Sequence, residues 1–217
     1  MNRFIREILL WIMMLIPYGY LAYIWNDLPD QVPTHFNISG KADDWSGKST
    51  LLLVPSAIGV FIYGLMLLLP FLDPKRKLNR MGDKYHSLRF MLVLFMSGLS
   101  VYLLYVSKVG QIENPQWLLA IIGLMLTMLG NYFQALRPNY FVGIRTPWTL
   151  ENEEVWKKTH YLGGRLWMAG GLLIVICSFV VKAHVPLLII AGVILLILII
   201  VPVAFSFLEF RRQSPAK

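Results

Sequence analysis

A histidine and two neighbouring aspartates could do chemistry in the segment formed by residues 26–49. His35 precedes Asp43 by two helical turns' worth of chain, and Asp44 follows directly. An imidazole and a carboxylate can ligate a metal ion, or can act as a base and its orienting partner in a hydrolase. The segment holds one histidine, however, and no nucleophile stands out beside it. We therefore expect no catalytic residue, no metal and no other cofactor.

The same segment has the features of a small ordered loop. Pro29 and Pro33 favour an extended backbone, and residues 37–40 favour a turn. Phe36 and Trp45 can pack against a membrane surface, while the aspartates can cap a turn or the start of the next helix. Exposed acidic and aromatic side chains also suit recognition of a cationic or apolar ligand. The candidate ligand-facing residues are His35, Phe36, Asp43, Asp44, Trp45 and Lys48.

A second polar segment, residues 137–165, contains charges in a helical order. These charges are Glu151, Glu153, Glu154, Lys157, Lys158 and His160. Acidic residues before basic ones match the helix macrodipole, so we expect Thr149 to cap a short helix on the membrane surface. A glycine pair at 163–164 would act as a hinge into the next span. Arg145, in an extended stretch, can hold Glu153, Glu154 or a lipid phosphate, and His160 fits a surface or capping position.

The composition is typical of a membrane protein. Of the 217 residues, 57% are hydrophobic and 15% are charged, with a mean hydropathy of +0.59. Soluble globular proteins have roughly 25% charged residues, so a soluble enzyme or a soluble nucleic-acid-binding domain is excluded. The single cysteine, Cys177, excludes an intrachain disulfide and a cysteine-based zinc site.

Six apolar runs approach the length of about 20 residues that crosses a hydrocarbon core. They are residues 8–25, 50–72, 90–107, 117–136, 162–181 and 185–208. Because backbone groups in lipid must be satisfied within the segment, runs of this length form helices. The sequence therefore predicts an all-α integral membrane protein with six transmembrane helices.

The basic residues predict the orientation of these helices. Of the 20 lysines and arginines, sixteen fall on one side of the membrane and four on the other: Lys41, Lys48, Lys108 and Lys182. Since short cytoplasmic loops are enriched in lysine and arginine, both termini are expected to be cytoplasmic. Residues 26–49 would then form a small ordered extracellular loop, and residues 137–165 would include a cytoplasmic juxtamembrane helix. The net charge of +8 is thus a topology signal, and no direct contact with nucleic acid is expected.

The predicted spans have no ionisable side chain near their middle. Proton-coupled transporters place such groups deep in the bilayer, so this class is disfavoured, although a carrier using backbone or hydroxyl groups stays open. Gly123, Thr127 and Asn131 recur at intervals of four residues in the fourth span. Small and polar residues on one helix face favour a contact between helices.

At its two polar segments the sequence resembles the SdpI family of bacterial membrane proteins, which give immunity against secreted killing peptides of the sporulation-delaying type. The stretch NYFVGIRTPWTLENEEVWKKTHYLGG resembles the most diagnostic motif of this family. The stretch LPDQVPTHFNISGKADDWSGK resembles a short module of unknown function that often precedes the SdpI region. The matching residues of the first motif are Gly143, Ile144, Arg145, Thr146, Trp148, Thr149, Leu150, Val155, Trp156, Lys157, Thr159 and His160.

The resemblance implies a multispanning protein of the bacterial plasma membrane that meets an extracellular toxin peptide. The best-known family member also holds a small winged-helix repressor at the membrane, which implies a cytoplasmic partner in addition to membrane lipids. The residues expected to carry this docking are Gly143, Arg145, Thr146, Trp148, Thr149, Trp156, Lys157, Lys158 and His160. Residues 1–72 would form a helix pair with the loop module 26–49. Residues 73–217 would form an SdpI-like region of four helices with the motif loop 137–165.

The leading hypothesis is an immunity and sensor protein in which the outer loop meets the peptide and the inner loop offers a docking surface. Two other classes stay open. An envelope enzyme acting on lipid or peptide could use His35 with Asp43, or Arg145 with His160, but the sequence shows no nucleophile with an evident base. A small peptide or drug transporter is the other, and the lack of charge at mid-span counts against it.

Overall fold

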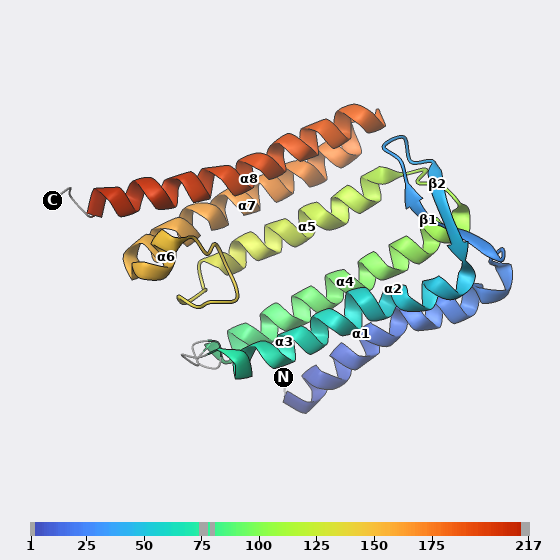
Figure 1. Cartoon of the computed structure of the whole chain (residues 1–217), viewed down its shortest axis with the longest axis horizontal. Helices are drawn as coiled ribbons and strands as arrows, with labels where there is room; N and C mark the ends of the chain where they lie inside the picture. The colour runs from blue at the N-terminus through green and yellow to red at the C-terminus, as the bar shows by residue number, and fades with distance from the viewer. Residues whose placement is uncertain (1–2, 74–77, 79–80, 214–217) are drawn as a thin grey trace. The chain divides into compact units, whose positions relative to one another are not determined.

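A computed structural model of the chain describes residues 3–73, 78 and 81–213, and most of these residues are helical (Figure 1). The helices are α1 (Arg3–Ile24), α2 (Leu53–Pro55), α3 (Phe61–Leu72), α4 (Asp83–Val109), α5 (Pro115–Phe133), α6 (Pro147–Glu151), α7 (Glu153–Val180) and α8 (His184–Gln213). Two strands, β1 (Gln31–Phe36) and β2 (Ala42–Gly47), lie between α1 and α2.

The prediction of six membrane-spanning helices is confirmed. Six helical stretches are long and apolar enough to cross a membrane: Phe4–Asp27, Lys48–Leu72, Asp83–Val109, Pro115–Phe133, Glu153–Val180 and His184–Gln213. The second stretch is irregular, because a 3-10 turn precedes α2 and a π turn at Ser56–Val60 follows it. Pro55 lacks a backbone donor, which accounts for a change of hydrogen-bond pattern at this point.

The chain forms two compact units that are not contiguous in sequence. Unit 1 consists of Met1–Leu67 and His86–Ile121, and unit 2 consists of Leu68–Tyr85 and Ile122–Lys217. Helices α3, α4 and α5 therefore each contribute residues to both units.

In unit 1, the loop after α1 is an antiparallel β-hairpin. Strands β1 and β2 pair with Pro33 opposite Trp45, and an irregular register follows towards the turn. The Asn37 side chain accepts hydrogen bonds from two backbone amides of the turn. Gly40 has a φ of +77°, a conformation that favours glycine. The predicted extended stretch and turn are confirmed, whereas the all-α class is wrong at these two strands because their pairing is not visible as an alternating apolar pattern.

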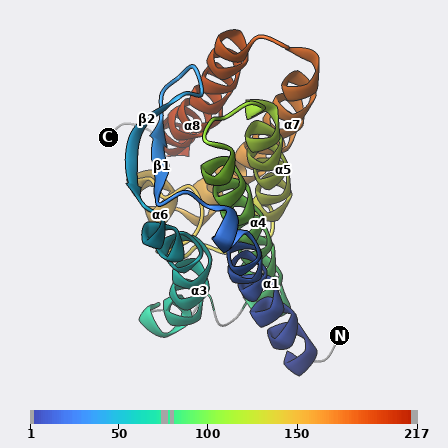
Figure 2. The same ribbon diagram turned by 90° about the vertical axis from the view of Figure 1, so that its right-hand side faces the viewer.

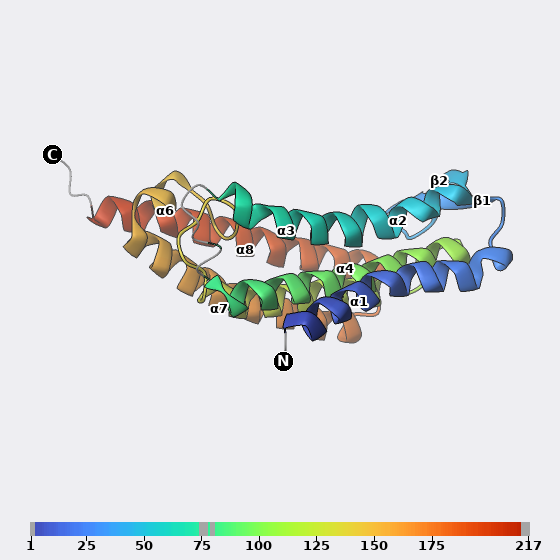
Figure 3. The same ribbon diagram turned by 90° about the horizontal axis from the view of Figure 1, so that it is seen from below.

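The hairpin is fixed to the ends of α1 and α4, beyond the end of α1 that is opposite the N-terminus (Figure 3). Its Val32 is fully buried in an apolar cluster that consists of Leu21, Ile24, Leu28, Val32, Leu51 and Leu104. The amide of Ile112, in the loop between α4 and α5, donates to the carbonyl of Gly40 at 2.8 Å. Lys108 pairs with Asp27 at 2.6 Å. Apolar packing at its base and a backbone hydrogen bond at its tip therefore hold the hairpin in place.

Unit 1 also contains a buried ion pair at the opposite end of α4. Arg89 lies in this helix, is 4% exposed and pairs with Glu7 of α1. The hydroxyl of Tyr63 on α3 donates to the same carboxylate at 3.0 Å, and its ring lies beside the guanidinium. Because α4 begins earlier than the apolar run predicts, Arg89 is part of a span and not of a loop.

In unit 2, α7 packs along α8 and against the second half of α5 (Figure 2). The contact between α5 and α7 is made by backbone: a Cβ added at Gly123 would lie 2.7 Å from the carbonyl oxygen of Gly171. A Cβ added at Gly130 would lie 2.6 Å from the carbonyl oxygen of Gly164. Such close approach of two helices requires glycine on both sides.

The predicted helix contact in this span is confirmed for Gly123 and Thr127, which both lie against Gly171. It is wrong for Asn131, which is exposed. With about 100° between successive residues, the seventh residue after Gly123 returns close to the same face and the eighth does not. Gly130 therefore occupies the place that the simple spacing of four assigned to Asn131.

Candidate functional site

The exposed part of the hairpin, called here the hairpin surface, carries the first group of predicted residues: His35, Phe36, Asp43, Asp44, Trp45 and Lys48. His35 Nδ1 lies 2.5 Å from a carboxylate oxygen of Asp43, and both side chains are exposed. Asp44 accepts from the amide of Trp45, so neither aspartate caps the following helix. Lys48 lies 3.5 Å from Asp30. The structure thus brings His35 and Asp43 together, as one of the predicted pairings.

This histidine and aspartate pair has no third ligand. Among the residues that the structure describes, no group of three or more histidine, cysteine, aspartate or glutamate side chains could hold a metal ion. Zinc in proteins takes three or four such ligands. The aromatic part of the hairpin surface is more prominent, because Trp45 is 53% exposed and Ile38, in the turn, is 76% exposed.

A small cavity beside the hairpin was not anticipated from the sequence. It has a volume of about 230 Å³, and its lining includes Tyr102, Tyr105, Glu113 and Trp117. We call it the aromatic cavity. Gln111, which also lines it, forms an isolated bridge with Lys41 at the hairpin tip and donates to Glu113 at 3.1 Å. The available signal was a short loop with aromatic residues on both sides, but only the fold shows that they share a cavity with a carboxylate.

The second predicted group lies in the motif loop, residues 137–165, which is a compact hydrogen-bonded structure. Asn139 is buried, and its side-chain oxygen accepts from the amides of Phe141 and Val142. Its side-chain nitrogen donates to the carbonyls of Arg137 and Val142. One asparagine therefore closes the turn that leads from α5 into the diagnostic motif.

The expected helix cap is wrong by three residues. Thr146 and not Thr149 is the N-cap of α6: its hydroxyl accepts from the Thr149 amide, and Pro147 takes the first helical position. Thr149 is fully buried, and its hydroxyl accepts from the Thr146 amide and donates to the carbonyl of Ile144 at 2.9 Å. Thr146 also reaches Ser206 of α8 at 3.0 Å. The two threonines thus link the motif to α8.

The expected separate juxtamembrane helix with a glycine hinge is also wrong. α6 ends at Glu151, Asn152 caps the next helix, and α7 continues through Gly163 and Gly164 to Val180. These glycines serve close packing: a Cβ at Gly163 would lie 2.6 Å from the Ile144 side chain, and Gly164 contacts α5. The charged residues expected in a surface helix form the first turns of a membrane-spanning helix.

His160 is 1% exposed, so the expectation of a surface histidine is wrong. Its ring stacks on Trp156 with 4.0 Å between centroids. Nδ1 donates to the carbonyl of Trp156 and Nε2 accepts from the amide of Ile144, each at 2.9 Å. A ring nitrogen that accepts carries no proton, so this geometry holds the imidazole in its neutral form. Gly143 has a φ of +113° and leaves no room for a Cβ beside the ring.

The exposed part of the motif loop is small. Arg145 donates to the carbonyl of Tyr140 at 2.7 Å and does not hold Glu153 or Glu154. Those glutamates pair with Lys157 at 3.3 Å and with Lys158 at 2.7 Å. Among the nine predicted docking residues, the buried ones are Thr146, Thr149, Trp156 and His160, and the exposed ones are Arg145, Lys157 and Lys158. Half-buried Trp148 packs against Phe207 of α8.

Comparison with known proteins confirms the resemblance. Residues 135–206 match the model of the SdpI/YfhL protein family, and residues 12–59 match DUF1648, a domain of unknown function. The chain is 23% identical over 197 residues to Immunity protein SdpI of Bacillus subtilis (strain 168), covering 88% of each protein. No solved structure matches the chain. With its six spans, the chain is a multi-pass protein of the bacterial plasma membrane that carries a DUF1648 region followed by an SdpI/YfhL family region.

Proposed function

We propose that this chain is a membrane immunity protein that protects a bacterium from a secreted antimicrobial peptide of the sporulation-delaying type. The observation that carries the proposal is the extent of the likeness to Immunity protein SdpI, which covers 88% of both chains. A likeness of this extent takes in both the hairpin and the motif loop, so it is not a property of apolar spans alone. In this proposal the protein acts by binding the peptide and not by catalysis.

The hairpin surface and the aromatic cavity are the proposed contact for the toxin peptide. The distribution of basic residues supports an extracellular location for both, because only four of the 20 lie on that side. Exposed Trp45 and Ile38 offer apolar area, and aromatic residues are enriched in protein interfaces. In the aromatic cavity, Glu113 beside Tyr105 and Trp117 suits a lysine, an arginine or an amino terminus of the peptide.

The exposed residues of the motif loop are the proposed contact for a cytoplasmic partner such as a winged-helix repressor. Arg145 and Lys157 present positive charge there, and the buried threonines and His160 would act by holding this surface in shape. Signalling further requires two states of the bundle with different affinity for the peptide. An amine-reactive reagent tests this: added toxin should change the labelling of Lys157, and unchanged labelling at saturating toxin would refute the sensor role.

Survival of a peptide-sensitive bacterium tests immunity. Cells expressing the wild-type protein are challenged with a sporulation-delaying-type toxin and compared with an empty vector at matched membrane protein levels. Protection by the wild type supports the proposal, and loss of protection with Arg145→Ala would include the motif loop in the mechanism. Absence of protection, with the protein present in the membrane, would favour the enzyme or transporter classes.

The toxin contact has its own matched pair of variants. Trp45→Ala removes an exposed aromatic from the hairpin surface, and Tyr23→Ala removes one that is 82% exposed on α1, outside the hairpin. Glu113→Gln removes the charge of the aromatic cavity while keeping its shape. Trp45→Ala and Glu113→Gln should lower survival and Tyr23→Ala should not. Equal survival of all three would exclude this surface as the contact.

A further inference from the structure

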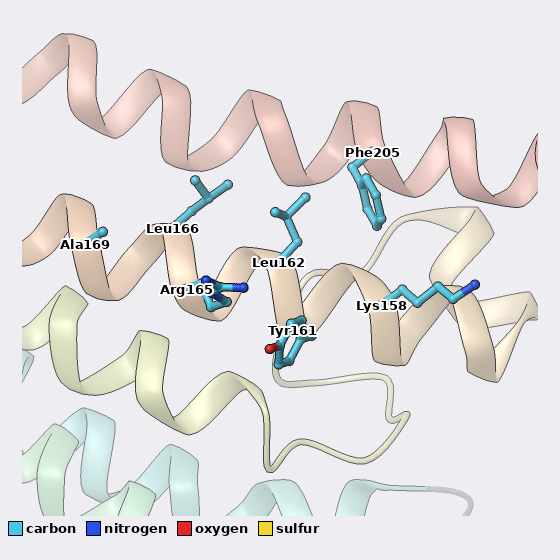
Figure 4. A pocket seen from close by; sticks show the side chains of 7 residues that line it. All are labelled: Lys158, Tyr161, Leu162, Arg165, Leu166, Ala169 and Phe205. Atoms are coloured by element: carbon cyan, nitrogen blue, oxygen red, sulfur yellow. The ribbon is translucent and has the colours of Figure 1, made fainter.

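A groove between α7 and α8 has both apolar and basic walls (Figure 4). Its volume is about 540 Å³. The apolar walls are formed by Leu162, Leu166, Ala169 and Phe205, and Lys158 and Arg165 lie along the same groove. The groove is near the end of α7 that follows α6, and it is separate from the hairpin surface and the aromatic cavity. Neither part of the proposed function uses it.

The two cations of the groove differ in how far their charge is compensated. Lys158 lies 2.7 Å from a carboxylate oxygen of Glu154 and 2.7 Å from one of Glu209. Arg165 has no carboxylate partner and donates no hydrogen bond within the part of the chain that the structure describes. The uncompensated positive charge of the groove is therefore that of Arg165.

The contact that Arg165 does make leaves its donors available. Its guanidinium lies over the ring of Tyr161, 5.7 Å from the centroid. A cation over an aromatic ring uses the face of the guanidinium, while the five N–H groups point outward in its plane. A planar fork of this kind binds phosphate through two parallel hydrogen bonds.

The position of Arg165 along α7 corresponds to the level of lipid headgroups. Arg165 precedes the end of the helix at Val180 by roughly four turns, or about 22 Å at 1.5 Å per residue. The hydrocarbon core is about 30 Å thick, so the backbone of Arg165 lies inside the boundary on the α6 side. Its long side chain can extend to the interface, as it does over Tyr161. A charge at this depth is costly without a partner.

From this arrangement we infer that the groove binds an anionic phospholipid. The phosphate contacts Arg165, and an acyl chain lies along the apolar side chains between α7 and α8. The groove complements both parts of such a molecule, because its charged end is at the interface and its apolar walls continue towards the middle of the helices.

Native mass spectrometry of the full-length protein tests this inference. The protein is purified in detergent and offered equal amounts of phosphatidylglycerol and phosphatidylcholine. We expect preferential retention of phosphatidylglycerol, and a loss of this preference of about tenfold in Arg165→Gln, as for one strong charge-assisted contact. Arg211→Gln is the matched control, since Arg211 also lies 5.7 Å from an aromatic ring one turn earlier on its helix but outside the groove. It should behave as the wild type.

Two further arms separate a lipid site from a phosphate site. Ala169→Phe fills the apolar part and should lower retention without a change of charge, whereas Arg165→Lys should give an intermediate preference. Glycerol phosphate, which has the anionic group without acyl chains, should not displace the lipid. Equal retention of the two lipids by the wild type, equal preference in Arg165→Gln and Arg211→Gln, or full displacement by glycerol phosphate would each overturn the inference.

Discussion

Substitution of one glycine in the contact between α5 and α7 gives a quantitative prediction. A Cβ at Gly130 would lie 2.5 Å from the backbone nitrogen of Met168, 2.6 Å from the carbonyl oxygen of Gly164 and 2.8 Å from Cβ of Trp167. Ordinary contacts of a Cβ begin near 3.4 Å. Because two of the three obstructing atoms are backbone, no side-chain rotation can relieve the overlap, and the helices must move apart by about 1 Å.

The cost of this movement follows from the lost dispersion contacts. A gap of 0.5–1 Å forfeits about a quarter to a half of each contact, and a contact is worth about 0.1–0.2 kcal/mol. If about 40 atom pairs cross the interface, Gly130→Ala destabilises the protein by about 2–3 kcal/mol. For a chain of this length the corresponding decrease of the melting temperature is about 5–10 °C.

The lone cysteine provides the assay. Cys177 lies on α7 and is half-buried, so reaction of its thiol with a fluorogenic maleimide reports unfolding during heating of the protein in detergent. Gly192→Ala is the control, because nothing lies within 4 Å of a Cβ added in that part of α8. We expect this control to melt within about 2 °C of the wild type, as surface substitutions do. Equal melting temperatures for Gly130→Ala and Gly192→Ala would refute the reasoning.

Three further predictions use the same assay. Thr149→Val removes the buried hydroxyl that donates to Ile144 and should destabilise by about 2–4 kcal/mol, while Thr149→Ser should restore most of the loss; equal effects of both would contradict it. Glu7→Ala leaves the buried guanidinium of Arg89 without its carboxylate and should cost about 2 kcal/mol or more, a result that an unchanged melting temperature would exclude. His35→Gln breaks an exposed ion pair and should leave the melting temperature unchanged, so a large decrease would show that the hairpin depends on that pair.

Length and apolarity were sufficient to predict the six spans, because a helix is the only local solution for a long apolar segment in lipid. The beginnings of helices needed finer signals. Thr146 followed by Pro147 is a signature of an N-cap and first helical residue, and it is visible in the sequence, yet the acidic residues further on pointed to Thr149. The macrodipole pattern predicted the helix polarity and misplaced its start.

Features that depend on distant residues could not be predicted. His160 is surrounded in sequence by lysines, a threonine and a tyrosine, which suggest a surface, but the loop before α6 folds back over it and Trp156 stacks on it. The aromatic cavity depends in the same way on the fold, since Tyr105 and Trp117 come from two helices. Local patterns report one segment, and burial depends on several.

The burial of the diagnostic motif affects how genetic screens of this protein should be interpreted. A random mutagenesis screen for loss of toxin resistance will return many substitutions at Thr149, Trp156 and His160, since each leaves hydrogen bonds or a packed ring unsatisfied. Losses of one or two kcal/mol are enough to lower the steady-state amount of a protein several-fold through quality control. Such variants will be sensitive because little protein reaches the membrane. Substitutions that abolish resistance at normal abundance will instead identify the residues that meet the toxin.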